Sequence, residues 1–306
     1  MANRIEPYCG VIPALYTCFG EDGELSAERT RALARLLVNK GVKGLYVGGS
    51  SGECIYLDKA ERMRLLEAVM DEVGDRCTII AHVACNNTRD SMALAAHAEG
   101  LGVNAIACIP PIYFHLPEHA IARYWNDISA AAPDTDFFIY NIPQLAGVGL
   151  SVSLLQTMRQ NPRVVGVKNS SMPTQDIQMF KAEGGADFAV LNGPDEQFVA
   201  GRAIGADGGI GGTYGVMPEL FLKMDELLRA GKLEEARRLQ YAANEIIYAM
   251  CDCHGNMYAV IKRILTLREE RDFGAVRSPL PALSSDDLPQ VERCRRMIDA
   301  AIATLG

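Results

Sequence analysis

Short apolar runs alternate with longer stretches of helical periodicity over the first 230 residues of the chain. Runs such as residues 44–47 (GLYV) and 164–167 (VVGV) are typical of strands buried on both faces of a parallel sheet. Capping residues such as Ser26 and the pair Asp58 and Glu61 mark where intervening helices begin. The pattern predicts strands over residues 11–16, 44–47, 78–81, 105–109, 137–140, 164–168, 188–191 and at the glycine run 208–214, and helices over 26–40, 58–73, 87–100, 117–128, 154–158 and 197–204.

The repeat of these units defines the expected architecture. A strand and a helix recur about every 30 residues, which is the spacing of βαβ units in a parallel sheet. Eight such units favour a closed (β/α)8 barrel over a doubly wound sheet. After Pro218 only helical patterns follow, at residues 222–229, 233–250, 257–267 and 288–305. We therefore expect a (β/α)8 barrel over residues 1–230 and a helical C-terminal extension over residues 231–306.

Composition and charge narrow the class of protein. The chain has 306 residues, is 49% hydrophobic and carries a net charge of −8, which argues against nucleic acid or an anionic membrane as a partner. No apolar run is long enough to span a bilayer. Nine scattered cysteines, without a secretory signal at the N-terminus, predict reduced thiols and a cytoplasmic location. We read residues 251–254 (CDCH) as structural, because no second ligand pair lies at a matching distance, and we expect no metal.

One strand ends in a residue that is costly to bury. The run at residues 164–167 leads directly into Lys168. Burial of an ammonium group is unfavourable, so a lysine that points into the barrel should have a lowered pKa and a nucleophilic amine. Such an amine can form a Schiff base with a carbonyl substrate. The alternative is a lysine that leaves the strand for solvent or pairs with a carboxylate.

Other polar residues follow the same ends of different strands, where (β/α)8 barrels carry their active sites. These residues are Ser50, Ser51 and Glu53 after the second strand, Tyr113 after the fourth, Tyr140 at the fifth, and Asp195 and Glu196 after the seventh. Each has a structural alternative as a turn residue, a core tyrosine or a helix cap. Their coincidence at one end of the barrel favours a functional role for Lys168.

The residue types indicate the chemistry. The turn at residues 48–52 (GGSSG) leaves backbone N–H groups and hydroxyls free to hold a carboxylate, and it lacks a phosphate-binding G-x-x-x-x-G-K pattern. A carboxylate held beside an amine nucleophile indicates a 2-oxo acid. Tyr140 can move protons between nucleophile, substrate and water.

Four motifs resemble those of the N-acetylneuraminate lyase / dihydrodipicolinate synthase superfamily. They are residues 48–53 (GGSSGE), 140–143 (YNIP), 166–168 (GVK) and 208–211 (GGIG). The resemblance spans essentially the whole chain and implies a Schiff-base enzyme without metal or cofactor that acts on pyruvate or releases it, usually as a homotetramer. The chain looks most like the lyase branch, because the synthase branch usually has an arginine at the position of Leu145.

The resemblance also implies roles for individual residues. Lys168 would form the Schiff base, Tyr140 would transfer the proton, and Tyr113 would belong to the proton relay, supplied by a neighbouring subunit. Lyases commonly have a serine at the position of Gly212, so the glycine would leave the polyol tail of a sugar acid with one hydrogen bond fewer. The expected substrate-binding residues are Ser50 and Ser51 at the carboxylate, Gly193, Asp195 and Glu196 at the polyol tail, and also Ser170 and Gly212.

The expected reaction is the reversible aldol cleavage of a 2-oxo sugar acid, with N-acetylneuraminate favoured, to pyruvate and N-acetylmannosamine. Three alternatives stay open. The chain could be an aldolase or dehydratase for another 2-keto-3-deoxy sugar acid, an enzyme of synthase-like pyruvate condensation, or a non-catalytic sensor of 2-oxo acids. The pair Lys168 and Tyr140 argues against the sensor, since a binding protein needs no nucleophile.

Overall fold

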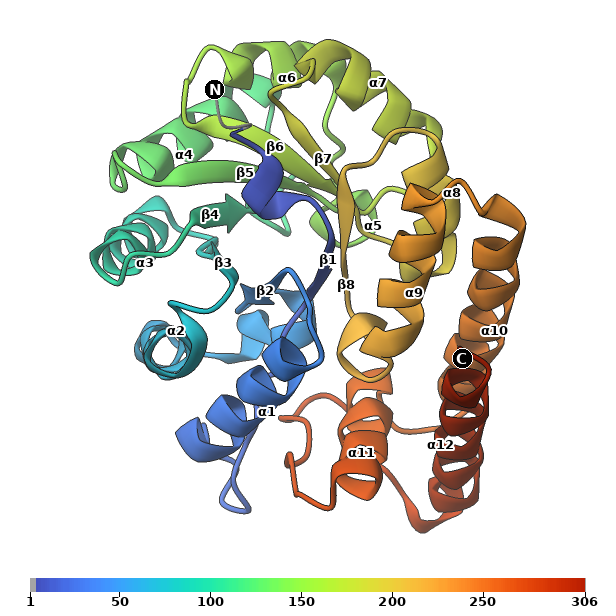
Figure 1. The fold of residues 1–306 in the computed structure, drawn as a ribbon. Coiled ribbons are helices and arrows are strands. Elements are labelled where there is room, and N and C mark those ends of the chain that lie inside the picture. The colour runs from blue at the N-terminus through green and yellow to red at the C-terminus, as the bar shows by residue number, and fades with distance from the viewer. Residues whose placement is uncertain (1–3, 306) are drawn as a thin grey trace.

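Eight parallel strands form a barrel in the computed structural model, which describes residues 4–305 (Figure 1). The order of neighbouring strands is β1-β8-β7-β6-β5-β4-β3-β2, and a bridge between Ala14 and Tyr46 joins β1 to β2. The predicted (β/α)8 barrel is thereby confirmed. The strands are β1 (Val11–Pro13), β2 (Gly44–Val47), β3 (Thr78–His82), β4 (Ala105–Cys108), β5 (Asp136–Asn141), β6 (Val164–Asn169), β7 (Ala189–Asn192) and β8 (Gly208–Gly211).

Helices surround the barrel, and several begin at the predicted caps. The side chain of Ser26 accepts a hydrogen bond at the start of α1, and Asp58 and Glu61 form a capping box at α2. Helix α7 was not predicted, because Ile177 and Phe180 are the only large side chains that it buries. The helices around the barrel are α1 (Ala27–Asn39), α2 (Lys59–Val73), α3 (Thr88–Gly100), α4 (Glu118–Ala130), α6 (Val152–Arg159), α7 (Gln175–Gly184), α8 (Phe198–Ala203) and α9 (Pro218–Arg229), with the single turn α5 (Pro143–Ala146) after β5.

Two layers of core result from the alternation of side chains along the strands. The inner layer fills the barrel and includes Tyr46, Phe138 and Tyr140, while the outer layer lies between strands and helices. Strand β6 has a register shift opposite the step from Phe137 to Phe138. This irregularity decides where Lys168 points.

The helices after α9 lie at one side of the barrel, next to α8 and α9 (Figure 1). They are α10 (Leu233–Cys251), α11 (Met257–Glu269) and α12 (Leu288–Ala303). The long helices α10 and α12 lie side by side, and α11 reaches the loop that follows β2 through a buried ion pair between Lys262 and Glu53. The C-terminal helices therefore contact the end of the barrel that carries the polar motifs.

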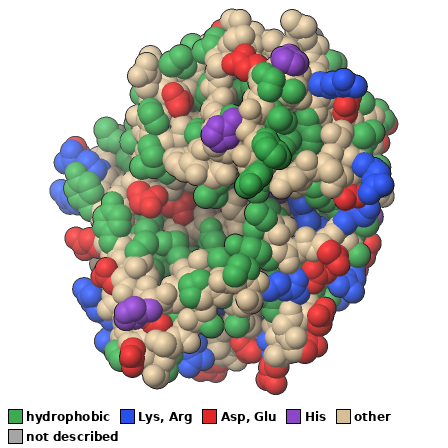
Figure 2. Space-filling model, turned by 180° about the vertical axis from the view of Figure 1, so that it is seen from behind, with side chains coloured by type: hydrophobic (Ala, Val, Ile, Leu, Met, Phe, Trp, Pro, Cys, Tyr) green, Lys and Arg blue, Asp and Glu red, His purple; other side chains and the backbone are tan. Residues whose placement is uncertain are grey.

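Within residues 4–305, no helix is long and apolar enough to cross a membrane. Seen from behind, hydrophobic side chains gather over the middle of one face, and Lys and Arg side chains lie mostly toward its edge (Figure 2). In the same part of the chain, no group of three His, Cys, Asp or Glu side chains is arranged to hold a metal ion.

Candidate active site

Lys168 points into the barrel because of an irregularity in β6. Strict alternation would give Lys168 the same direction as Val164, whose side chain packs in the outer core. Val165 packs inside and Val167 packs outside, because the register skips Val165 between Val164 and Gly166. A β-bulge of this kind re-aims the side chains that follow it. Lys168 therefore turns inward, where its side chain is buried.

The surroundings of Lys168 favour its neutral amine. Burial lowers the pKa of the Lys168 amine to about 7, and the Asp195 carboxylate opposes part of this shift. The Nζ atom lies 4.0 Å from the ring centre of Tyr140 and 4.5 Å from that of Tyr46. Within residues 4–305, the amine has no ion pair and no hydrogen bond. It is therefore available as a nucleophile.

Tyr140 lies one strand away from Lys168, directly opposite it in the register of β5 and β6. Burial raises the pKa of its hydroxyl to about 12, while hydrogen bonds with the hydroxyls of Ser50 and Ser170 act in the opposite direction. The phenol is thus protonated near neutral pH. It is placed to give a proton to a substrate bound at Lys168 and to take one back.

A cavity of about 280 Å³ opens above Lys168. The structure brings together at its wall all the predicted site residues except Tyr113. They are Ser50, Ser51, Tyr140, Lys168, Ser170, Gly193, Asp195, Glu196 and Gly212. Apolar side chains, among them Ile142, Leu145 and Met257, complete the wall. The size suits a small organic acid or sugar acid.

The two acidic residues of the cavity have different environments. Asp195 is buried, and its Oδ2 atom accepts hydrogen bonds from the backbone N–H and the hydroxyl of Thr213 at 2.5 and 2.6 Å. Burial raises the pKa of the Asp195 carboxyl to about 6, although the bonds from Thr213 lower it. Glu196 is exposed at the rim. Asp195 is therefore held in place by its own chain, whereas Glu196 is free to face a ligand.

Tyr113 does not reach this cavity in its own chain. It lies in the loop after β4, is 87% exposed and adopts a positive φ of 84°. Its ring packs edge to face against Phe114, and both line a separate surface hollow beside α4. A role in catalysis would need this loop to meet the cavity of another copy.

Sequence reasoning missed Tyr258 and Thr213. The Tyr258 hydroxyl lies at the cavity wall, 3.2 Å from Ser51 Oγ. Tyr258 belongs to α11, more than 200 residues after the serine that it meets. Thr213 follows the last glycine motif and secures Asp195. Neither residue has a local signal in the sequence, because each role depends on a contact between distant segments.

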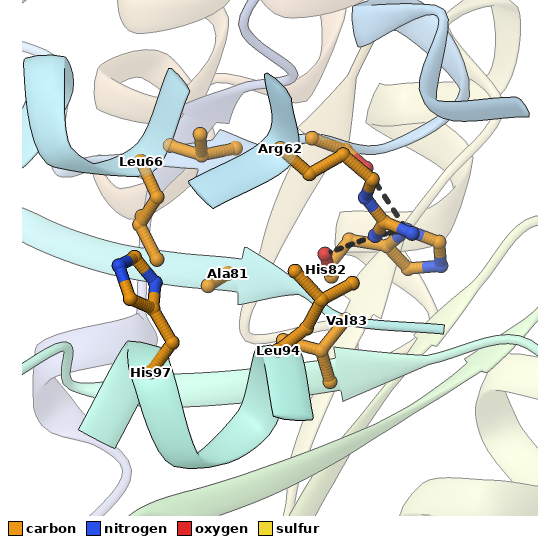
Figure 3. Close-up of a pocket in the computed structure, with 9 residues that line it drawn as sticks. Arg62, Leu66, Ala81, His82, Val83, Leu94 and His97 are labelled. Carbon is orange, nitrogen blue, oxygen red and sulfur yellow. Dashed lines mark hydrogen bonds between the residues drawn. The ribbon is translucent and has the colours of Figure 1, made fainter. Parts of the chain in front are cut away.

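A second polar cluster, formed by Arg62 and His82, lies beside Tyr140. Figure 3 shows these residues in a small internal cavity. The buried guanidinium of Arg62 donates to the carbonyl oxygens of His82 and Ala84 at 2.5 and 2.6 Å. His82 lies beside Tyr140, with 5.9 Å between ring centres, and its Nδ1 bonds the carbonyl oxygen of Gly48 at 2.9 Å. Burial and Arg62 hold the pKa of His82 well below its usual range. The cluster thus places a neutral imidazole next to the catalytic tyrosine candidate.

Fold and site together define a class of protein. The (β/α)8 barrel has a buried lysine at a strand end, with no ion pair among the described residues, a tyrosine beside it and a turn with free hydroxyls at the same cavity. Such a site is equipped for imine chemistry on small carbonyl acids. The chain belongs to the dihydrodipicolinate synthetase family, whose pattern matches residues 7–297.

Within this family, the chain is similar in sequence to N-acetylneuraminate lyases. The chain is 63% identical over 296 residues to an N-acetylneuraminate lyase of Mediterraneibacter gnavus, an alignment that covers 97% of this chain and 94% of the relative. It is 34% identical over 281 residues to N-acetylneuraminate lyase 2 of Escherichia coli, with 91% of this chain and 90% of the relative covered.

The chain is also similar to solved structures of sialic acid aldolases. The chain superposes with a TM-score of 0.97 on the wild-type sialic acid aldolase of Ruminococcus gnavus, at 62% identity, over 98% of this chain and 100% of the other. A catalytic lysine mutant of that aldolase gives a TM-score of 0.98, at 61% identity and 99% coverage of both chains.

Proposed function

We propose that this protein is a pyruvate-dependent class I aldolase that cleaves N-acetylneuraminate reversibly to pyruvate and N-acetylmannosamine. The observation that carries the proposal is the Lys168 amine, which is buried in the barrel, has no ion pair or hydrogen bond within residues 4–305, and has its pKa lowered by burial to about 7. The choice of sugar acid rests on the 63% identity to an N-acetylneuraminate lyase. The existence of a catalytic lysine in the related aldolase supports the role of the amine.

The first steps create an electron sink. The neutral amine of Lys168 attacks the C2 ketone of the open-chain sugar acid, and loss of water gives an iminium ion. Tyr140, protonated because its pKa is about 12, supplies the proton with which that water leaves. Ser50 and Ser51 hold the carboxylate next to C2.

In the cleavage step Tyr140 acts as a base, whereas in the first steps it acts as an acid. The phenolate of Tyr140 takes the proton of the C4 hydroxyl, the C3–C4 bond breaks, and its electron pair moves to the iminium nitrogen to give an enamine. N-acetylmannosamine leaves as the aldehyde. Protonation of the enamine at C3 and addition of water then release pyruvate and regenerate the Lys168 amine.

The remaining expectations belong to the same proposal. A homotetramer would let the loop of Tyr113 meet the cavity of a neighbouring subunit, which is supported by the exposure of Tyr113 and Phe114. A cytoplasmic location is supported by the free cysteines of the described residues. Gly193, Asp195 and Glu196 at the cavity wall would face the polyol tail.

Reductive trapping tests the proposal. Pyruvate with borohydride should attach one reduced pyruvyl group to Lys168, as located by peptide mass spectrometry, and should abolish cleavage of N-acetylneuraminate. Lys168→Ala should form no adduct and release no pyruvate. An adduct on another lysine would refute the role of Lys168. Release of pyruvate from a six-carbon 2-keto-3-deoxy acid but not from N-acetylneuraminate would refute the substrate.

A further inference from the structure

Helix α11 contacts the turn after β2 through two side chains that lie one helical turn apart. Tyr258 meets Ser51, and Lys262 meets Glu53. Residues four apart in a helix share one face, so α11 presents both groups to the same loop. The mechanism above uses the hydroxyl of Ser51 but assigns no role to this helix.

The ion pair fixes the helix against the loop. Lys262 Nζ lies 2.7 Å from Glu53 Oε1, and both side chains are fully buried. Lys262 also donates to the carbonyl oxygen of Ala275 at 2.8 Å, and the other oxygen of Glu53 accepts from the backbone N–H of Arg277 at 2.8 Å. Glu53 itself adopts a left-handed conformation with φ 58° at the end of the turn. These bonds leave little freedom between α11 and the residues 50–53.

Tyr258 reaches the cavity from this fixed helix. The Ser51 hydroxyl and the Tyr258 hydroxyl are hydrogen-bonded at 3.2 Å, and both residues line the cavity above Lys168. Burial raises the pKa of Tyr258 to about 12, so the phenol keeps its proton. Gly212 lies against the pair, and a Cβ atom there would be 3.0 Å from Ser51 Oγ and 3.7 Å from the Tyr258 ring. The absence of a side chain at Gly212 leaves room for the contact.

A hydroxyl group has one proton to donate but can also accept. In the structure the Ser51 hydroxyl donates its hydrogen bond to Tyr258. When Ser51 donates to a bound carboxylate instead, the Tyr258 hydroxyl can turn and donate a hydrogen bond to Ser51 Oγ. The serine then has a fixed rotamer and a polarised O–H bond. Without Tyr258, the serine hydroxyl could rotate toward other acceptors.

We propose that Tyr258 is a positioning residue, which orients the Ser51 hydroxyl toward the carboxylate of the 2-oxo acid. This inference rests on the proposed function, because it takes the ligand of Ser51 to be that carboxylate. It assigns to the C-terminal helices a part in substrate recognition. Tyr258 acts through Ser51 and takes no part in proton transfer at Lys168.

Tyr258→Phe tests the inference, since it removes the hydroxyl and keeps the ring. The pyruvate concentration that half-saturates the Lys168 adduct should rise about three- to tenfold, the range expected for one lost neutral hydrogen bond. The KM for N-acetylneuraminate should rise by a similar factor, and kcat should change less than about twofold. Tyr8→Phe is the matched control, because its buried hydroxyl bonds Asn104 and Asp136 away from the cavity. This control should leave both constants unchanged.

A double-mutant cycle distinguishes an indirect from a direct role. In a Ser51→Ala background, Tyr258→Phe should have little further effect, because the hydroxyl that it orients is gone. Additive effects would mean that Tyr258 contacts the substrate itself, and would overturn the inference. An unchanged half-saturating concentration, or a loss confined to kcat, would also overturn it. If the wild-type protein forms no pyruvate adduct, the proposed function fails. If the wild type forms the adduct and Tyr258→Phe has the same half-saturating pyruvate concentration, only the inference about Tyr258 fails.

Discussion

The lowered pKa of Lys168 predicts how the rate of Schiff-base formation depends on pH. Formation of the Schiff base requires the neutral amine, so its rate should follow the deprotonated fraction of Lys168. Burial lowers the pKa of this amine from the ordinary value of 10.5 to about 7. We therefore expect the rate of pyruvate adduct formation to be nearly constant above about pH 8 and to fall as the pH drops through 7.

The size of the effect follows from the two pKa values. At pH 7, an amine with a pKa near 7 is about half neutral, whereas an ordinary lysine is neutral in roughly one molecule out of 3,000. Below pH 6 the neutral fraction of Lys168 should decrease about tenfold for each pH unit. The environment of the barrel therefore supplies about a thousandfold more nucleophile at neutral pH.

The assay is the initial rate of adduct formation at saturating pyruvate, trapped with cyanoborohydride and quantified by intact-protein mass spectrometry between pH 5 and 10. Asp195→Asn supplies a directional check. The Asp195 carboxylate raises the pKa of Lys168, so its removal should move the midpoint to lower pH. The asparagine oxygen can still accept from Thr213. A wild-type midpoint near pH 10, or a shift to higher pH in the variant, would refute the reasoning.

Two further predictions concern the neighbours of Lys168. Tyr140→Phe should keep the fold and still form some pyruvate adduct, but it should lose roughly 10²–10⁴-fold in steady-state kcat, the usual contribution of a positioned acid–base group. A loss below about threefold would assign the proton to another group. Gly212→Ser should raise the KM for N-acetylneuraminate, because the new Cβ atom would lie 3.0 Å from Ser51 Oγ and disturb the contact with Tyr258. The resemblance to lyases alone predicts the opposite sign, so a lowered KM in steady-state assays would show that the added hydroxyl matters more than the crowding.

Local patterns were sufficient to predict most elements of the barrel. The caps at Ser26 and at Asp58 with Glu61 act within one helical turn, so their effect is visible in the sequence itself. Parallel strands buried on both faces appear as unbroken apolar runs, and the predicted strand at residues 44–47 coincides with β2. The first strand was predicted too long, because the chain after Pro13 keeps only a single bridge to β2.

The direction of Lys168 could not be derived from alternation alone. Counting back from Lys168 in steps of two leads to Val164, which faces the helices, so a regular strand would aim the amine out of the barrel. The bulge in β6 reverses this, with Gly166 opposite the ring of Phe138. The lack of a side chain at Gly166 permits the close approach, since a Cβ atom there would lie 2.3 Å from that ring. The sequence contains the glycine but no sign of the shift.

The three basic side chains Arg62, Lys168 and Lys262, all buried within residues 4–305, show why we expect only Lys168 to act as a nucleophile. Lys262 is paired with Glu53, and Arg62 donates to backbone carbonyl oxygens, so each has partners that stabilise its charge. Lys168 has no such partner within residues 4–305, and the carboxylate that raises its pKa, Asp195, is hydrogen-bonded to Thr213. A buried amine without a partner is most stable when neutral, which is also the form that attacks a ketone. Lys262 and Arg62 thus have partners that keep them charged, whereas Lys168 is left in the neutral form that the proposed reaction requires, and the difference lies in the hydrogen-bond partners that each side chain has.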